Sequence, residues 1–178
     1  MSLLQKVFVK KKEKPGCMLQ KGVQEPLSVY APAAGNIIRL AEVKDGVFSE
    51  GILGKGCAVV PEMETIYAPF QGTIINVSDT KHAVGLKSDD GMEVLIHVGI
   101  DTVALNGQGF EMMVAVNDTV TCGQPILTFS KKVIEAAGYS DTVIVVVLNS
   151  DEYADIKVEK EGHVACLDKI LSLKDKKI

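Results

Sequence analysis

Two histidines, His82 and His97, flank a strong turn signal. The signal is Asp90-Gly91, and the runs on both sides are rich in β-prone residues, which predicts a β-hairpin. A loop of Asp90 and Gly91 alone would place His97 opposite Val84, with His82 as a diagonal neighbour on the same face. A loop of Ser88–Gly91 would place the histidines directly opposite each other, whereas an odd loop without a bulge would separate them. Either even loop brings the two imidazoles within about 4.5–8 Å.

Two adjacent imidazoles can carry out three kinds of chemistry. They can bind a metal, although two histidines without a nearby third ligand make an incomplete zinc site. They can exchange protons near neutral pH, or one can accept a phosphoryl group on a neutral nitrogen while the other steadies it. Alternate residues from Val94 to Ile100 are apolar, so they should enter the core while His97 points to the other face. The alternative is two unrelated surface histidines, and His163, in a turn-like stretch, is expected to be a bystander.

The elements that would position these side chains are mostly strands. Gly, Pro, Asp and Asn separate the β-prone stretches at short intervals, which predicts an all-β fold, an antiparallel sandwich or barrel, with few short helices. The best helical segment is Lys131–Ala137, and Gly138 suits its C-terminal end. The predicted strands are 36–40, 57–60, 72–77, 82–86, 92–100, 125–129 and 143–148.

The chain also repeats itself. The pattern Ala-Pro-x-x-Gly-x-Ile-Ile begins at Ala31 and returns at Ala68, and Val120-x-Cys122 returns as Val164-x-Cys166. Repeats on this scale predict two similar β units packed into one body.

Composition excludes several classes of protein. The 178 residues contain one arginine and no tryptophan, and the net charge is −4. Residues 1–25 hold six lysines against two glutamates, so the remainder is acidic, which argues against nucleic-acid binding. No apolar run approaches the ~20 residues that a membrane span needs. Residues 1–26 are expected to be a basic linker or arm, and the four scattered cysteines to be free thiols in the cytoplasm.

Two longer motifs carry a family resemblance. Thr80-Lys81-His82-Ala83 and the run from Leu95 to Val103, which reads LIHVGIDTV, closely resemble motifs of the glucose-type enzyme IIA domain of the bacterial phosphoenolpyruvate-dependent sugar phosphotransferase system. The resemblance covers roughly residues 28–150, with weaker support to Leu171. It implies an antiparallel β-sandwich with a duplicated hybrid motif, spanning residues 27–178.

The resemblance also implies roles for five residues. His97 would be phosphorylated on Nε2 by the histidine phosphocarrier protein and would pass the group to a cysteine of a IIB domain, which makes the chain a phosphotransferase component. His82 would be needed for donation, and Thr80 would orient it. The Gly99 carbonyl would hold Nδ1 of His97, and Asp101 would be an acidic neighbour.

Further expectations concern cofactors, partners and location. No cofactor is required, although His82 and His97 could hold zinc together with a carboxylate of a partner. The IIB domain could belong to the same polypeptide, and the protein is expected in the cytoplasm, free or tethered to the membrane through a permease.

One departure from the family concerns the site's surroundings. The best-known members ring the site with phenylalanines, whereas here Phe48 alone is aromatic and the other positions read Ser78, Val84, Leu95 and Val98.

Two other functions stay open at this point. One is a zinc hydrolase on a related hybrid-motif scaffold, although neither Leu95 nor Gly99 beside His97 can ligate a metal. The other is a non-catalytic carrier or assembly domain, because the Ala-Pro-x-x-Gly element resembles biotinyl and lipoyl carriers. Glu62 stands where those carriers have the attachment lysine, and a carboxylate cannot form that amide.

Overall fold

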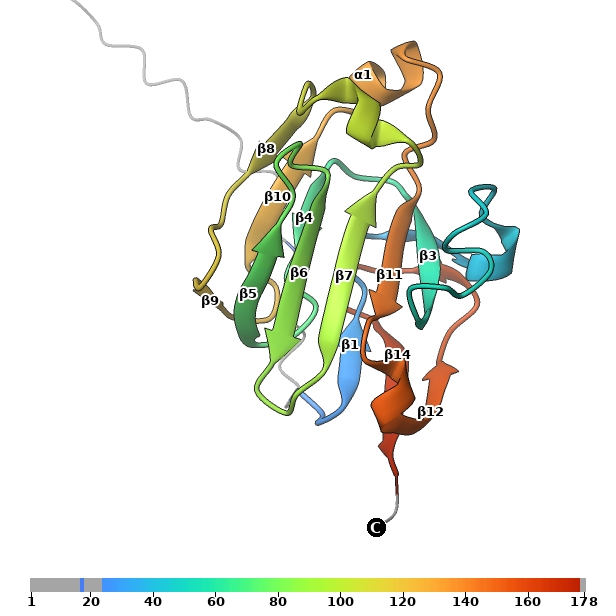
Figure 1. Ribbon diagram of the computed structural model, residues 1–178, viewed down its shortest axis with the longest axis vertical. Coiled ribbons are helices and arrows are strands. Elements are labelled where there is room, and N and C mark those ends of the chain that lie inside the picture. Colours follow the sequence, from blue (N-terminus) through green and yellow to red (C-terminus); the bar gives the residue numbers. More distant parts are fainter. Residues whose placement is uncertain (1–16, 18–23, 177–178) are drawn as a thin grey trace, which may run out of the picture.

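The computed structural model describes Cys17 and residues 24–176 (Figure 1). The predicted basic arm, residues 1–26, therefore lies almost entirely outside the described residues. Among the described residues, no helix is long and apolar enough to cross a membrane. Their helices are η1 (Leu40–Glu42), η2 (Thr102–Leu105), α1 (Lys131–Ala136) and η3 (Ser150–Glu152). Their strands are β1 (Ser28–Tyr30), β2 (Gly35–Arg39), β3 (Lys55–Pro61), β4 (Thr65–Tyr67), β5 (Gly72–Val77), β6 (Ala83–Ser88), β7 (Glu93–Val98), β8 (Phe110–Met112), β9 (Thr119–Val120), β10 (Pro125–Phe129), β11 (Val143–Val147), β12 (Tyr153–Val158), β13 (Gly162–Val164) and β14 (Lys169–Asp175).

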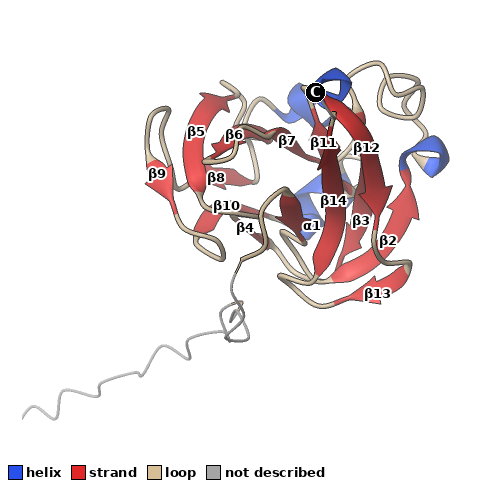
Figure 2. Cartoon of the chain, turned by 90° about the horizontal axis from the view of Figure 1, so that it is seen from below, coloured by secondary structure: helices blue, strands red, loops and turns tan. Residues whose placement is uncertain are grey.

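The strands form one large sheet and two small ones. The eight-stranded sheet has the order β13-β2-β3-β11-β7-β6-β5-β9, and the small sheets have the orders β1-β14-β12 and β4-β10-β8 (Figures 1 and 2). Neighbouring strands pair in an antiparallel manner, as in β11 with β7 and β6 with β7. The fold is the antiparallel β-sandwich that the sequence predicts, and β7 lies at the centre of its large sheet.

The predicted repeat is a structural duplication. The two Ala-Pro elements exchange reciprocal hydrogen bonds: the Tyr30 amide donates to the Pro69 carbonyl at 3.0 Å, and the Tyr67 amide donates to the Pro32 carbonyl at 2.9 Å. The large sheet is correspondingly symmetric, because β13-β2-β3-β11 mirrors β9-β5-β6-β7 in order. A pseudo-twofold axis therefore passes between β7 and β11.

Both faces of β11 are covered, which explains its unbroken apolar sequence. All five residues of Val143–Val147 are fully buried, as expected for a strand at the centre of a sheet. Val143, Val145 and Val147 face the main core. Ile144 and Val146 face the opposite way and belong to a second cluster with Leu40, Val43, Phe48 and Ala58. The segment between β2 and β3, residues 40–54, thus folds back over the outer face of the sheet; it is called the β2–β3 loop below.

The hairpin between β6 and β7 has a register that the sequence did not predict. Ala83 lies opposite His97 and Val84 lies opposite Ile96, so the loop contains the three residues Asp89–Gly91 rather than two or four. Gly91 adopts a φ of 96°, which permits a bulged three-residue turn. Both even-loop registers are therefore wrong.

Ile100 departs from the predicted alternation. It packs with Leu95 against the second cluster rather than in the main core. The reason is Gly99, whose φ of 81° ends the regular pleat after Val98.

The cysteines also differ from expectation. Cys17 and Cys166 are paired as a disulfide with their Cα atoms 5.8 Å apart, within the usual range for such a bridge. Cys57 and Cys122 are free thiols. The expectation of four free thiols is therefore wrong for Cys17 and Cys166, because chain distance says nothing about which cysteines the fold brings together.

Candidate functional site

β7 lies near the centre of the large sheet (Figure 1), and His97 is its penultimate residue. Its alternating neighbours Val94, Ile96 and Val98 are fully buried in the main core, so the side chain of His97 points the other way. Ile144 of β11 lies beside it in the sheet. A partly exposed imidazole is thus held on a rigid central strand.

His82 meets His97 even though the strand register would separate them. His82 precedes β6 and follows Lys81, which has a left-handed φ of 59°, so the regular alternation of β6 does not apply to it. The Val98 amide donates to the His82 carbonyl at 2.8 Å and holds this backbone beside β7. The two imidazole centroids lie 4.6 Å apart with the ring planes at 85°. The two histidines therefore lie together as predicted. The cause is the turn at Lys81 before β6, and not the register of the hairpin.

Two hydroxyl groups hold the ring of His82. The Oγ1 atom of Thr80 lies 2.6 Å from Nδ1 of His82, and Oγ of Ser78 lies 3.4 Å from the same nitrogen. Only 7% of His82 is exposed, and this burial lowers the pKa of its imidazole below the ordinary value. His82 therefore favours its neutral form, with Nδ1 engaged and Nε2 left free.

Aromatic rings line the pair on two sides. Phe48 of the β2–β3 loop approaches His97 edge-on, with centroids 5.0 Å apart, and Phe110 of β8 lies 6.4 Å from His82. Val84 and Val98 are fully buried, so they do not contribute to the surface around the site. Phe110 was not among the positions singled out from the sequence, since it comes from a strand on another sheet.

The environment of His97 strongly disfavours its charged form. Burial, followed by repulsion from His82, lowers the pKa of His97 to about 4, against smaller opposing effects from the Gly99 backbone, Asp45 and Asp101. Near neutral pH the ring is therefore uncharged, which leaves a nitrogen lone pair available as a nucleophile.

Asp45 was missed by the sequence analysis. Its carboxylate accepts hydrogen bonds from the amides of Phe48 and Ser49 at 2.9 and 3.0 Å, and these bonds lower its pKa although burial opposes them. Asp45-Gly46 reads only as a turn signal. Phe48 returns over the sheet because it packs in the second apolar cluster. The local sequence around Asp45 gives no sign of that cluster.

The segment after β7 is shaped by Gly99 and Thr102. The buried Thr102 hydroxyl donates to the Val98 carbonyl at 2.6 Å, which closes the bend that Gly99 begins. Asp101 is exposed with a φ of 60° and acts on His97 only through its charge. The Nδ1 atom of His97 is buried and has no hydrogen-bond partner among the described residues, although the Gly99 backbone is close enough to raise the pKa of the ring. The bond from Nδ1 to the Gly99 carbonyl stays a prediction.

Other groups lie away from the histidine pair. His163 is in β13, at the far edge of the large sheet, and its Nε2 lies 3.1 Å from the Glu62 carboxylate. Across Cys17 and residues 24–176, no group of three or more His, Cys, Asp or Glu side chains could hold a metal ion.

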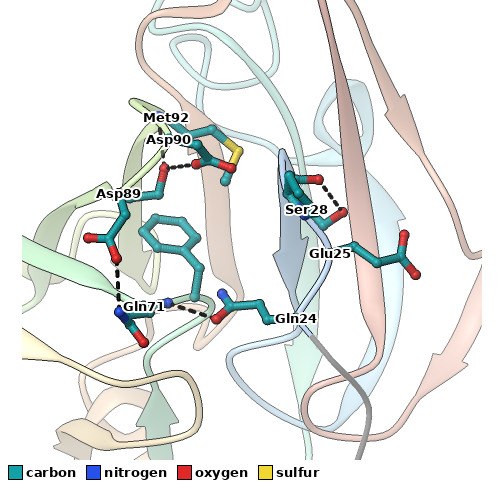
Figure 3. Close-up of a pocket in the computed structure, with 10 residues that line it drawn as sticks. Gln24, Glu25, Ser28, Gln71, Asp89, Asp90 and Met92 are labelled. Carbon is teal, nitrogen blue, oxygen red and sulfur yellow. Dashed lines mark hydrogen bonds between the residues drawn. The ribbon is translucent and has the colours of Figure 1, made fainter.

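A pocket of about 370 Å³ lies at the other end of the β6–β7 hairpin (Figure 3). Its charged lining residues are the carboxylates Glu25, Asp89 and Asp90, and Gln71 donates to Asp89 at 2.9 Å. An acidic lining repels a phosphoryl group, so this pocket does not compete with the histidine pair as the phosphoryl site.

Comparison with known proteins agrees with this fold. Residues 27–153 match the family model described as the phosphoenolpyruvate-dependent sugar phosphotransferase system, EIIA 1, and the chain belongs to this family. Within it, the chain is a glucose-type IIA domain. The solved structure of glucose permease IIA from Mycoplasma capricolum superposes with a TM-score of 0.77 at 34% identity, covering 83% of this chain and 96% of that chain.

Two named relatives show the range of proteins in which such domains occur. The glucose-specific EIIA component of Staphylococcus aureus (strain COL) is 35% identical over 144 residues, which is 81% of this chain and 87% of that protein. The beta-glucoside-specific EIIBCA component of Bacillus subtilis (strain 168) is 41% identical over 145 residues, which is 82% of this chain. The match covers only 24% of that longer protein.

Proposed function

We propose that His97 accepts a phosphoryl group from the histidine phosphocarrier protein and donates it to a cysteine of a IIB domain. The observation that carries this proposal is the contact between the two imidazole rings, at 4.6 Å, on the outer face of a rigid sheet. Membership of the family supports the general role of a phosphocarrier. The partners and the phosphohistidine intermediate are the new part of the proposal.

The proposed reaction has two balanced displacements. In the first, the lone pair of His97 Nε2 forms a nitrogen–phosphorus bond while the bond to the donor histidine breaks, and the donor nitrogen keeps the electron pair. In the second, a cysteine thiolate of the IIB domain forms a sulfur–phosphorus bond while the bond to His97 breaks. Such transfers depend mainly on alignment and charge stabilisation, and the docked partner supplies the alignment.

Each residue of the site has a distinct part in this proposal. The pKa of His97, lowered to about 4, keeps the acceptor neutral at physiological pH. Nδ1 of His82 is held by Thr80, which leaves Nε2 able to take up a proton from solvent. The protonated Nε2 would then donate to a phosphoryl oxygen as negative charge builds up. Gly99 would fix the tautomer of His97, and Asp101 would contribute negative charge at the rim.

No step of this reaction needs a cofactor. Zinc held by His82, His97 and a carboxylate of a partner is a separate prediction, and it would occupy the nitrogens that the phosphoryl group needs. The zinc hydrolase and the carrier domain gain no support from the described residues, since the two histidines make an incomplete zinc site and Glu62 pairs with His163.

The IIB partner is proposed to be either a separate protein or part of the same polypeptide. The printed name of the Bacillus subtilis relative, EIIBCA, combines B, C and A components. By analogy, residues 1–26 would serve as the connection to a permease, with residues 27–178 forming the IIA domain at the cytoplasmic side of the membrane.

Reconstituted phosphotransfer tests the proposal. Enzyme I, phosphoenolpyruvate and the histidine phosphocarrier protein should together add one acid-labile phosphate per chain. His97→Gln should abolish labelling, whereas His82→Gln should retain labelling and lose donation to IIB. His163→Gln is the matched control and should behave as the wild type. Undiminished labelling of His97→Gln would overturn the assignment.

A further inference from the structure

Ser78 makes two contacts that the proposed function does not yet use. It follows β5 and starts the tight turn that delivers His82. Its hydroxyl oxygen accepts a hydrogen bond from the Ala83 amide at 3.0 Å and lies 3.4 Å from Nδ1 of His82. The same hydroxyl is thus linked to the residue after His82 and to the ring of His82 itself.

The backbone around Ser78 fixes where this hydroxyl points. The Ser78 amide donates to the Ala83 carbonyl at 3.0 Å, and the Lys81 amide donates to the Ser78 carbonyl at 2.9 Å. The Ala83 amide also donates to the Ser78 hydroxyl. Ser78 is therefore bonded to both Lys81 and Ala83 across the turn. The Ser78 oxygen therefore cannot swing away from the imidazole without losing a bond to the backbone.

The hydrogen-bonding capacity of the groups allows a shared contact. A serine hydroxyl has two acceptor lone pairs and one proton, and the Ala83 amide occupies one lone pair. The second lone pair is free to accept a proton carried by Nδ1 of His82. Thr80 Oγ1, at 2.6 Å from the same nitrogen, is the stronger partner, so the proton on Nδ1 faces two oxygens.

We propose that Ser78 is a second positioning residue of the site, sharing the Nδ1 proton of His82 with Thr80 so that Nε2 is left to take up the solvent proton with which the ring donates to a phosphoryl oxygen. The inference rests on the proposed function, because it deepens the part played by His82. It concerns the ring orientation and tautomer of His82, and Ser78 does not touch the phosphoryl group itself.

The first test is the tautomer of His82, measured by nitrogen-15 NMR on the full chain. Ser78→Ala should lower the fraction of His82 that carries its proton on Nδ1, and it should slow donation to IIB about fivefold, the size expected for one neutral hydrogen bond. The rate at which His97 accepts phosphate should stay at the wild-type value. Ser78→Thr keeps a hydroxyl and should restore both readouts.

A double variant tests the sharing. Either oxygen alone can still accept the Nδ1 proton, so Ser78→Ala combined with Thr80→Val should slow donation by more than the product of the two single effects. A combined loss equal to that product would mean that the two hydroxyls act separately and would overturn the shared contact.

The matched control is Ser88→Ala. Ser88 closes the opposite end of β6 in a similar manner, accepting from the Met92 amide at 2.9 Å, but it is remote from His82. It should lower thermal stability as Ser78→Ala does and leave the His82 tautomer unchanged. The proposal is overturned if Ser78→Ala also leaves the tautomer unchanged, or if Ser88→Ala shifts it equally. Failure of the wild type to take up phosphate would instead reject the proposed function, while the NMR measurement would still decide the role of Ser78.

Discussion

The lowered pKa of His97 should make the stability of the fold depend on pH in a way that one substitution removes. In the unfolded chain His97 has its ordinary pKa of 6.5, and in the folded protein its pKa is lowered to about 4. Between these values the unfolded state binds the proton and the folded state does not. His97 therefore does not lower the free energy of unfolding above pH 6.5. Below that pH the free energy of unfolding decreases as the pH falls toward 4.

The difference between the two pKa values sets the size of the effect. Over the whole range it corresponds to roughly 3 kcal/mol, and at pH 4.5 about 2.5 kcal/mol should already be lost relative to pH 7. This is a large part of the 5–15 kcal/mol by which small domains are usually stable.

The assay is urea unfolding at pH 7 and pH 4.5 for the wild type, His97→Gln and His97→Asn. Carboxylates titrate over the same range in all three proteins, so the difference between wild type and variant isolates His97. The wild type should lose about 2.5 kcal/mol more than either variant. Equal losses in all three proteins would refute the reasoning that burial keeps His97 neutral.

Two further predictions concern the backbone and the cysteines. Gly99→Ala should lower the free energy of unfolding by at least about 2 kcal/mol more than Gly138→Ala. Both glycines have a φ of 81°, but a Cβ at Gly99 would collide with Thr102 and lie 2.8 Å from the Ser140 carbonyl. Nothing lies within 4 Å of a Cβ at Gly138. Equal losses of stability in thermal unfolding would reject the collision. Thiol titration of the unfolded, unreduced protein should count two thiols, and four after reduction, because Cys17 and Cys166 are paired; four thiols before reduction would contradict the pairing.

Much of the fold could be predicted because the signals were local. The β-prone stretches 72–77 and 125–129 coincide with β5 and β10, and the helix over Lys131–Ala136 begins at Ser130, whose hydroxyl accepts from the Val133 amide at 3.3 Å. Short strands such as β1, β4 and β9 were not expected, because two or three residues carry no usable periodicity. Their positions are set by pairing with distant strands, as in Gly72 opposite Val120.

The site shows the same division between local and non-local information. The proximity of His82 and His97 was correctly predicted from a hairpin argument whose register was wrong. The positive φ of Lys81 restored the contact, and a lysine gives no warning of that conformation. Phe48 lies 49 positions before His97, and Phe110 lies 28 positions after His82. Only the tertiary packing brings these rings into contact.

The pseudo-twofold axis between β7 and β11 has a consequence for the number of reactive groups. Rotation about the central pair, Ile96 with Val145, carries His97 onto Val146. That valine is fully buried beneath the β2–β3 loop, and the corresponding connection between β5 and β6 is much shorter and leaves His97 partly open. The two halves of the sheet therefore use the same position differently. One half places the proposed acceptor, His97, there, and the other half places a buried valine that packs with Phe48 of the β2–β3 loop. The duplicated frame thus offers one site for the proposed chemistry instead of two.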